Sequence, residues 1–184
     1  MTTRPDARST DYNDHTTGRT VTFKGYTNAQ GTAATPLTIT GCGTVVLESA
    51  TANNHTNVVN GAIAVENGAT LQINKDVVVG GTGSISLAAG ATLAIPANDD
   101  RTISVRDIVP LVLPDTGTAT LRVDGNTRLP SGKYTLLDSV PENYANLEVD
   151  RTTAAIAGRH ASVDEKNGQL VLNIVPDGLM IIFR

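Results

Sequence analysis

Large side chains are nearly missing from this sequence. Tryptophan is absent, and aromatic residues make up 3% of the 184 positions. Globular cores usually depend on aromatic rings, because each ring buries a large apolar area. The core of this chain must therefore be built from valine, isoleucine, leucine, alanine and threonine.

Cysteine, charge and long apolar runs are also scarce. Cys42 is the single cysteine, which excludes an intrachain disulfide. The net charge of −4 argues against a nucleic-acid-binding surface, which needs a basic field. The longest apolar run, Leu179–Phe183, is far too short to cross a bilayer, so we expect no membrane span.

The residues that are plentiful favour β-structure. The chain holds 26 threonines, 18 valines and 11 isoleucines. Branching at Cβ restricts χ1 and suits a pleated strand. The 17 glycines and 14 asparagines tolerate the left-handed backbone of tight corners. Many short strands joined by tight turns are therefore expected.

One segment of the chain recurs after 22 residues. Ile63–Ile73 (IAVENGATLQI) matches Ile85–Ile95 (ISLAAGATLAI) at six identical positions. A weaker copy, Leu37–Leu47, precedes the first by 26 residues. Each unit reads as strand, small-residue corner and strand, with alternating apolar positions. One such unit cannot bury its apolar face alone, whereas stacked copies can.

These repeats predict an all-β fold, a right-handed parallel β-helix (solenoid) with a C-terminal capping sheet. We expect a polar lead-in or cap over 1–19, β-helix rungs over 20–118 and a capping β region over 119–184. The alternative is an antiparallel β-sandwich, which short strands at 8–12-residue spacing would also fit. Further strands are expected at Thr20–Lys24, Thr102–Val105, Ala119–Val123, Gly132–Leu137, Leu147–Val149 and Gln169–Val175.

At these repeats the chain resembles the passenger repeats of bacterial autotransporters. Gly43–Leu47, Thr51–Val59, Gly68–Leu71 and Gly83–Leu93 fill the Gly/Thr/Leu and Asn/Thr-rich slots of that pattern. Leu129–Leu137 is similar to the segment that closes such helices. The resemblance covers about half the chain and extends to surface repeat proteins of the verrucomicrobial and planctomycete kind.

The resemblance implies adhesion or a surface scaffold at the cell surface or outside the cell. It supplies no catalytic residue that maps onto this chain. Autotransporters end in a transmembrane β-barrel, but no barrel-length segment precedes Arg184. We therefore expect a passenger fragment or another export route, with the export signal outside this sequence. Surface glycans or proteins of a host or environment are the expected partners.

Candidate chemical groups are few and dispersed. His15, His55 and His160 have no metal-ligand partner nearby in sequence, so we expect exposed loop histidines. Cys42 lies between two glycines and is expected to be a small core residue. Asp99 and Asp100 could act as paired carboxylates or bind calcium. Arg101 follows them directly, which favours a solvated corner.

Two other segments are interpreted as structural. Asp164–Gly168, with its charged Asp164–Lys166 run, is expected to be a turn. Gly80–Gly83 lacks the lysine and helix of a phosphate loop, so a solenoid corner is expected. We assign no catalytic, cofactor-binding or metal-binding residue.

The outward positions of the aligned units favour a non-enzymatic role. Glu66 aligns with Ala88, Gln72 with Ala94, and Asn74 with Pro96, so no ionisable pair recurs. Catalysis needs a positioned acid or base, whereas a flat, weakly polar wall suits packing or adhesion. The alternatives are a carbohydrate-active β-helix, a polysaccharide lyase or hydrolase, and a phage fibre segment. In the less regular stretch 96–118, Asp99–Arg101, Arg106 and Asp107 cluster.

Overall fold

The computed structural model describes residues 20–24, 37–48, 57–60, 62–74, 77–80, 84–97 and 110–176. The expected lead-in 1–19 and the expected strand Thr102–Val105 lie outside these ranges. Within them the chain is almost entirely β-strand, with one short 3-10 helix, η1 (Tyr144–Asn146).

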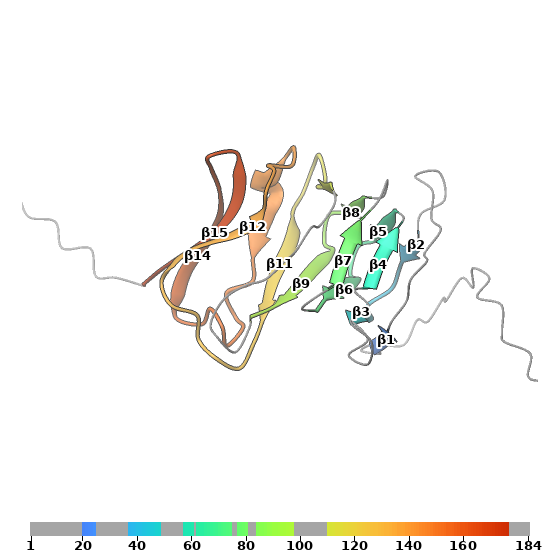
Figure 1. Ribbon diagram of the computed structural model, residues 1–184, viewed down its shortest axis with the longest axis horizontal. Coiled ribbons are helices and arrows are strands. Elements are labelled where there is room, and N and C mark those ends of the chain that lie inside the picture. Colours follow the sequence, from blue (N-terminus) through green and yellow to red (C-terminus); the bar gives the residue numbers. More distant parts are fainter. Residues whose placement is uncertain are drawn as a thin grey trace, which may run out of the picture.

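The strands form three parallel sheets, and successive strands of one repeat unit lie in different sheets. The six-stranded sheet runs in the order β1 (Thr20–Lys24), β3 (Thr44–Glu48), β6 (Thr70–Ile73), β9 (Thr92–Pro96), β11 (Ala119–Asp124) and β13 (Leu147–Val149). The four-stranded sheet runs in the order β10 (Leu111–Val112), β8 (Ile85–Leu87), β5 (Ile63–Val65) and β2 (Leu37–Ile39). The third sheet pairs β4 (Asn57–Asn60) with β7 (Val77–Gly80). This stacking is a parallel β-solenoid (Figure 1).

The register between rungs is the one that the sequence repeats predict. Ile63 pairs with Ile85, and Leu71 pairs with Leu93, which confirms the 22-residue offset. Leu37 pairs with Ile63 across the longer offset of 26 residues. Equivalent aliphatic side chains therefore stack in columns through the interior. Ile63, Leu71 and Ile85 are fully buried.

The corners between paired strands are tight turns that need glycine. In the turn Ala88–Ala91 the N–H of Ala91 donates to the carbonyl of Ala88 at 3.0 Å, and Gly90 has a φ of +80°. A type II β-turn requires this left-handed conformation at its third residue. The N–H of Gly90 then donates to the carbonyl of Thr118 on the next rung, at 2.8 Å. The corners thus extend the ladder between rungs.

An antiparallel sheet closes the C-terminal end of the solenoid. It runs in the order β12 (Gly132–Leu137), β15 (Gln169–Pro176) and β14 (Arg159–Lys166). Figure 1 shows this sheet at the left, at the opposite end from β1 and β2. A change from parallel to antiparallel pairing ends the repeat, as a solenoid requires.

The boundary between rungs and cap differs from the expected one at 118/119. β11 pairs in parallel with β9, and β13 pairs in parallel with β11. The structure therefore places two strands of the expected capping region in the solenoid sheet. Their sequences lack the Gly-Ala corner of the earlier repeats, so alignment alone does not reveal that they continue it.

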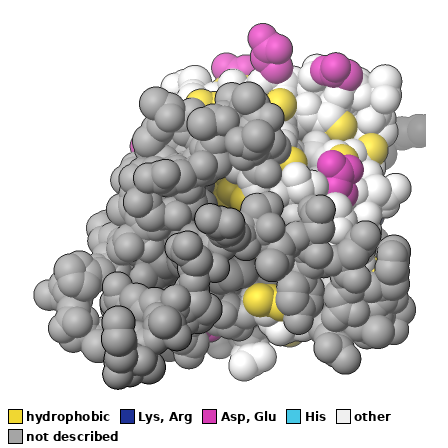
Figure 2. All heavy atoms as spheres, turned by 90° about the vertical axis from the view of Figure 1, so that its right-hand side faces the viewer, with side chains coloured by type: hydrophobic (Ala, Val, Ile, Leu, Met, Phe, Trp, Pro, Cys, Tyr) yellow, Lys and Arg dark blue, Asp and Glu magenta, His cyan; other side chains and the backbone are white. Residues whose placement is uncertain are grey.

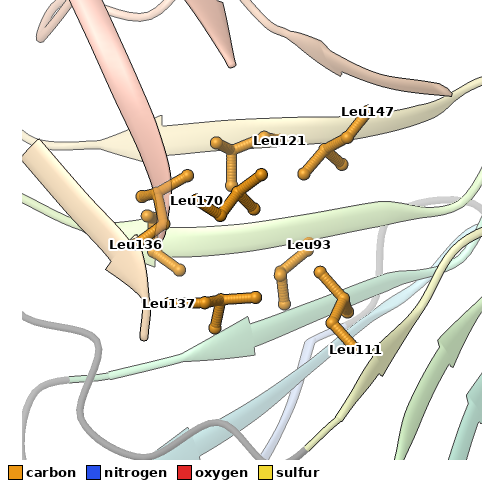
Figure 3. A pocket seen from close by; sticks show the side chains of 8 residues that line it. Leu93, Leu111, Leu121, Leu136, Leu137, Leu147 and Leu170 are labelled. Carbon is orange, nitrogen blue, oxygen red and sulfur yellow. The ribbon is translucent and has the colours of Figure 1, made fainter. Parts of the chain in front are cut away.

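Leucine side chains join the cap to the solenoid. Leu136 and Leu137 of β12 and Leu170 of β15 point toward Leu93 and Leu121 of the six-stranded sheet (Figure 3). All five side chains are at most 7% exposed. The solenoid and its cap therefore share one hydrophobic core. Separating the cap from the solenoid would expose these leucine side chains to water.

We expect Leu71→Ala to lower the free energy of unfolding by about 2–5 kcal/mol, because it leaves a cavity in the stacked interior column. The matched control is Gln72→Ala on the same strand, where the side chain points outward. That variant should cost less than about 1 kcal/mol. Urea denaturation of both variants measures the difference, and equal losses would contradict the register.

Gly90→Ala should destabilise the fold by about 1–3 kcal/mol, because its φ of +80° is strained for a residue with Cβ. An added Cβ would also lie 2.5 Å from Asn67 Oδ1. Gly132→Ala is the control, since nothing lies within 4 Å of a Cβ there. Thermal melts should separate the two variants; a stable Gly90→Ala protein would mean that the corner is built differently.

Candidate binding face

The outward side of the six-stranded sheet carries two groups of polar side chains that are hydrogen-bonded to one another. We call this surface the outer face and define it by the outward positions of β3, β6, β9 and β11. Side chains alternate along each strand, so these positions fall between the buried aliphatic columns. They form three columns: Thr44, Thr70, Thr92 and Thr120; Val46, Gln72, Ala94 and Arg122; and Glu48, Asn74, Pro96 and Asp124.

Threonine occupies one column of the outer face without interruption. The register pairs Thr20 with Thr44, and the column continues through Thr70, Thr92 and Thr120 before Glu148 ends it. Neighbouring strands lie about 4.8 Å apart, so the threonines are regularly spaced. Cross-strand threonine pairs each contribute about 0.2–1 kcal/mol to a sheet. This column therefore stabilises the stacking of rungs.

Amide and carboxylate side chains link two rungs beside the threonines. Gln72 Nε2 of β6 donates to Oδ1 of Asn74, the residue directly after β6, at 2.8 Å. Asn74 Nδ2 in turn donates to Glu48 Oε1 of β3 at 3.2 Å. These two bonds join the side chains of Gln72, Asn74 and Glu48 across two neighbouring rungs.

An ion pair continues the polar network toward the cap. Arg122 Nε and Nη2 donate to the two carboxylate oxygens of Asp124, at 2.9 and 3.0 Å. This bidentate geometry is the strong form of the Arg–carboxylate pair. The side chains are 29% and 35% exposed, so they remain accessible while being held in place.

Asp150 lies directly after β13, beside this pair. Its Oδ1 accepts hydrogen bonds from the Thr152 hydroxyl at 2.7 Å and from the Thr152 N–H at 2.9 Å. These bonds, together with the positive charge of Arg122, hold the pKa of Asp150 below its ordinary value, against a smaller effect of burial. The carboxylate is therefore kept ionised.

The outer face differs from the flat, wettable wall expected from the aligned units. Ala94 is fully buried and Val46 is 5% exposed. The expectation of exposed small side chains was therefore wrong at these two positions. Gln72 and Arg122 are the register neighbours of Ala94. The polar groups thus form two clusters around a buried centre.

Cys42 is exposed, which corrects the expectation of a small core residue. β2 ends at Ile39 and β3 begins at Thr44, so Cys42 lies in the corner and outside both strands. Gly41, with a φ of +82°, turns the chain just before it. The alternation of a strand therefore does not apply to this residue.

His160 is exposed, as expected, but it lies on strand β14 and not in a loop. His15, His55, Asp99, Asp100 and Arg101 lie outside the described residues, as do Arg106 and Asp107. Gly80 ends β7, and the rest of Gly80–Gly83 lies outside the described ranges. Of these candidates the structure describes His160 and Gly80 alone.

The charged run Asp164–Lys166 forms the end of strand β14, which corrects the expected turn. Lys166 pairs with Gln169, and the turn consists of Asn167 and Gly168 alone. An Asn-Gly pair supports a two-residue hairpin, so both strands extend to its edge. This dipeptide was the signal that could have located the turn.

The cavity between solenoid and cap is a packing defect rather than a ligand site. Its volume is about 10 Å³, at the lower limit for one water molecule, and its lining is aliphatic (Figure 3). Among the described residues, no three His, Cys, Asp or Glu side chains gather closely enough to hold a metal ion. The polar clusters of the outer face are therefore the best candidate for contact with another molecule.

The β1 and β2 end of the molecule has a different character. Figure 2 looks at this end and shows hydrophobic side chains at the surface beside acidic ones. Val21 and Leu37 are 39% and 41% exposed, although both occupy interior columns. Exposure here follows from their position on the outermost described rung.

No family model, curated protein or solved structure matches this chain. No helix in the described ranges has the length and apolar character needed to cross a membrane.

The lowered pKa of Asp150 predicts a specific acid sensitivity. Its stabilising effect is present above the ordinary pKa of 3.8 and is lost as the pH falls from there through the lower folded-state value. Asp150→Asn should remove this part of the pH dependence, and Thr152→Ala should weaken it. Denaturant titrations across acidic pH test this, with Arg151→Gln as the control that keeps it. Unchanged pH profiles in all three variants would contradict the assignment.

Proposed function

We propose that this chain is a non-enzymatic structural and adhesive module of an exported bacterial surface protein. Its outer face is the binding surface. The observation that carries the proposal is the preorganised polar network on a stacked parallel sheet. Glu48, Gln72 and Asn74 hold one another across two rungs, and Arg122 and Asp124 form a second fixed group. The resemblance to autotransporter passenger repeats points to the same role.

A surface of this kind suits ligands that carry many hydroxyl or amide groups. Its side chains offer both donors and acceptors, and their hydrogen bonds to each other reduce the entropy lost on binding. Exposed single contacts are weak, but the two polar clusters lie on different rungs of one face, so a polymer that contacts both gains avidity. Surface glycans, and proteins at the surface of a host or environmental particle, are the partners of this chemistry.

The state of Asp150 supports binding over hydrolysis. A glycosidase requires a carboxyl group that remains protonated near neutral pH, which needs a raised pKa. The pKa of Asp150 is lowered, and the Arg122 guanidinium contributes to that shift. Asp150, whose carboxylate accepts two hydrogen bonds from Thr152, is therefore suited to accepting hydrogen bonds and poorly suited to donating a proton.

Binding of the purified chain to immobilised bacterial and host glycans and to extracellular-matrix proteins tests this function. The double variant Arg122→Ala, Asp124→Ala should raise the Kd for any ligand that the wild-type chain binds about tenfold, the equivalent of roughly 1.4 kcal/mol. The same substitutions should leave the far-ultraviolet circular dichroism spectrum unchanged. Lys133→Ala, which changes an exposed residue of β12 in the cap, is the control that should keep full binding.

Two results would overturn the proposal. One is depolymerisation of a polysaccharide by the purified chain, measured as new reducing or unsaturated ends. The other is binding that the double variant and the Lys133→Ala variant reduce equally, because the outer face would then have no special role.

A further inference from the structure

Two Asn-Gly pairs in the described part of the chain occupy contrasting environments. Asn67-Gly68 forms a corner of the solenoid, and Asn167-Gly168 forms the tip of the β14–β15 hairpin. Asn-Gly is a chemically labile sequence, because the glycine N–H can attack the asparagine side chain without steric hindrance from a Cβ. The folded environment then decides which pair reacts.

The Asn67-Gly68 pair is held between rungs. The Gly68 N–H donates to the carbonyl of Gly90 at 3.1 Å, and the Ala69 N–H donates to the carbonyl of Glu66 at 3.0 Å. The side chain of Asn67 lies against Gly90, whose ideal Cβ position is 2.5 Å from Oδ1. Reaction at Asn67 would require the Gly68 nitrogen to leave its hydrogen bond and the side chain to leave the neighbouring rung.

The Asn167-Gly168 pair is open. Asn167 and Gly168 have φ values of +54° and +78°, as a type I′ hairpin turn requires. The residues of both pairs are exposed, so exposure does not separate them; the difference is that nothing lies within 4 Å of an ideal Cβ at Gly168. In the described structure no hydrogen bond engages the side chain of Asn167 or the N–H of Gly168.

We propose that Asn167 is a site of spontaneous covalent modification in the folded protein, whereas Asn67 is protected. Hydroxide removes the proton of the Gly168 N–H, and the nitrogen attacks Cγ of Asn167. The new N–Cγ bond forms as the Cγ–Nδ2 bond breaks, and the departing NH2 group takes a proton from water and leaves as ammonia, which regenerates hydroxide. Water then opens the resulting succinimide at either carbonyl, which gives aspartate or isoaspartate. No electrons are transferred in either step.

The modification acts on the cap, because the hairpin sets the position of β15. The product adds a negative charge beside Glu165, and isoaspartate also lengthens the backbone by one methylene. Lys166 pairs with Gln169 directly across the turn. Leu170 follows immediately and is fully buried against the solenoid. A longer turn therefore strains the strand that closes the core.

Peptide mapping by mass spectrometry tests the proposal on the full chain, incubated at mildly alkaline pH in H2(18)O. The peptide containing Asn167 should gain the mass of amide-to-acid conversion with one heavy oxygen, at a rate near that of the denatured chain. The peptide containing Asn67 should convert at least about tenfold more slowly than in the denatured chain. That factor corresponds to roughly 1.4 kcal/mol of local opening free energy.

Asn167→Gly is the matched variant, because glycine keeps the left-handed turn and lacks the carboxamide. It should abolish conversion at this turn and leave the peptide containing Asn67 unchanged. Equal protection of both sites in the folded chain, or equal conversion of both, would overturn the proposal. Prolonged incubation should also lower the melting temperature of the wild-type chain more than that of the Asn167→Gly variant; the same loss in both would refute the effect on the cap.

Discussion

In-register stacking is the constraint on which this structure depends. A rung is too thin to bury its own aliphatic residues, so each interior side chain is covered by its equivalents on the rungs beside it. Ile63 is fully buried between Leu37 and Ile85, whereas Leu37, on the outermost described rung of its sheet, is 41% exposed. Stability is therefore shared between neighbours, as in other repeat proteins, and each end must be treated differently from the middle.

The antiparallel cap meets this requirement at one end. It covers the last rungs with leucines from β12 and β15. Because its own strands are antiparallel, it does not present another rung on which the parallel stacking could continue. Its β14 strand carries Arg159, Asp164, Glu165 and Lys166, and charged side chains on a strand at the edge of a sheet oppose pairing with another chain. The same sheet therefore completes the core and ends the repeat.

The strand register could be predicted from the sequence wherever the spacing between the two strands of a unit is constant. Leu37 to Thr44, Ile63 to Thr70 and Ile85 to Thr92 each span seven positions, and all three registers were predicted. Leu111 and Thr120 are nine positions apart, and the sequence alone does not reveal this longer corner as a continuation. Asn146 Nδ2 fixes it by donating to the Pro114 carbonyl at 2.7 Å, a contact between residues 32 positions apart. Arg122 and Asp124 lie on β11, the strand after this longer corner. Their position on the outer face was therefore not predicted from the sequence.

The outer face combines one constant column of side chains with columns that vary from rung to rung. One of its columns repeats threonine on five successive strands, which is a uniform solution to the packing of neighbouring strands. The adjacent columns change at every rung, from Val46 to Gln72 to Ala94 to Arg122, although the backbone geometry stays the same. Val46 and Ala94 are buried, so Gln72 and Arg122 are the members of this column that another molecule could contact. The variation, held in place by the constant threonine column, is therefore where a solenoid of this kind can acquire specificity for a ligand without altering its fold.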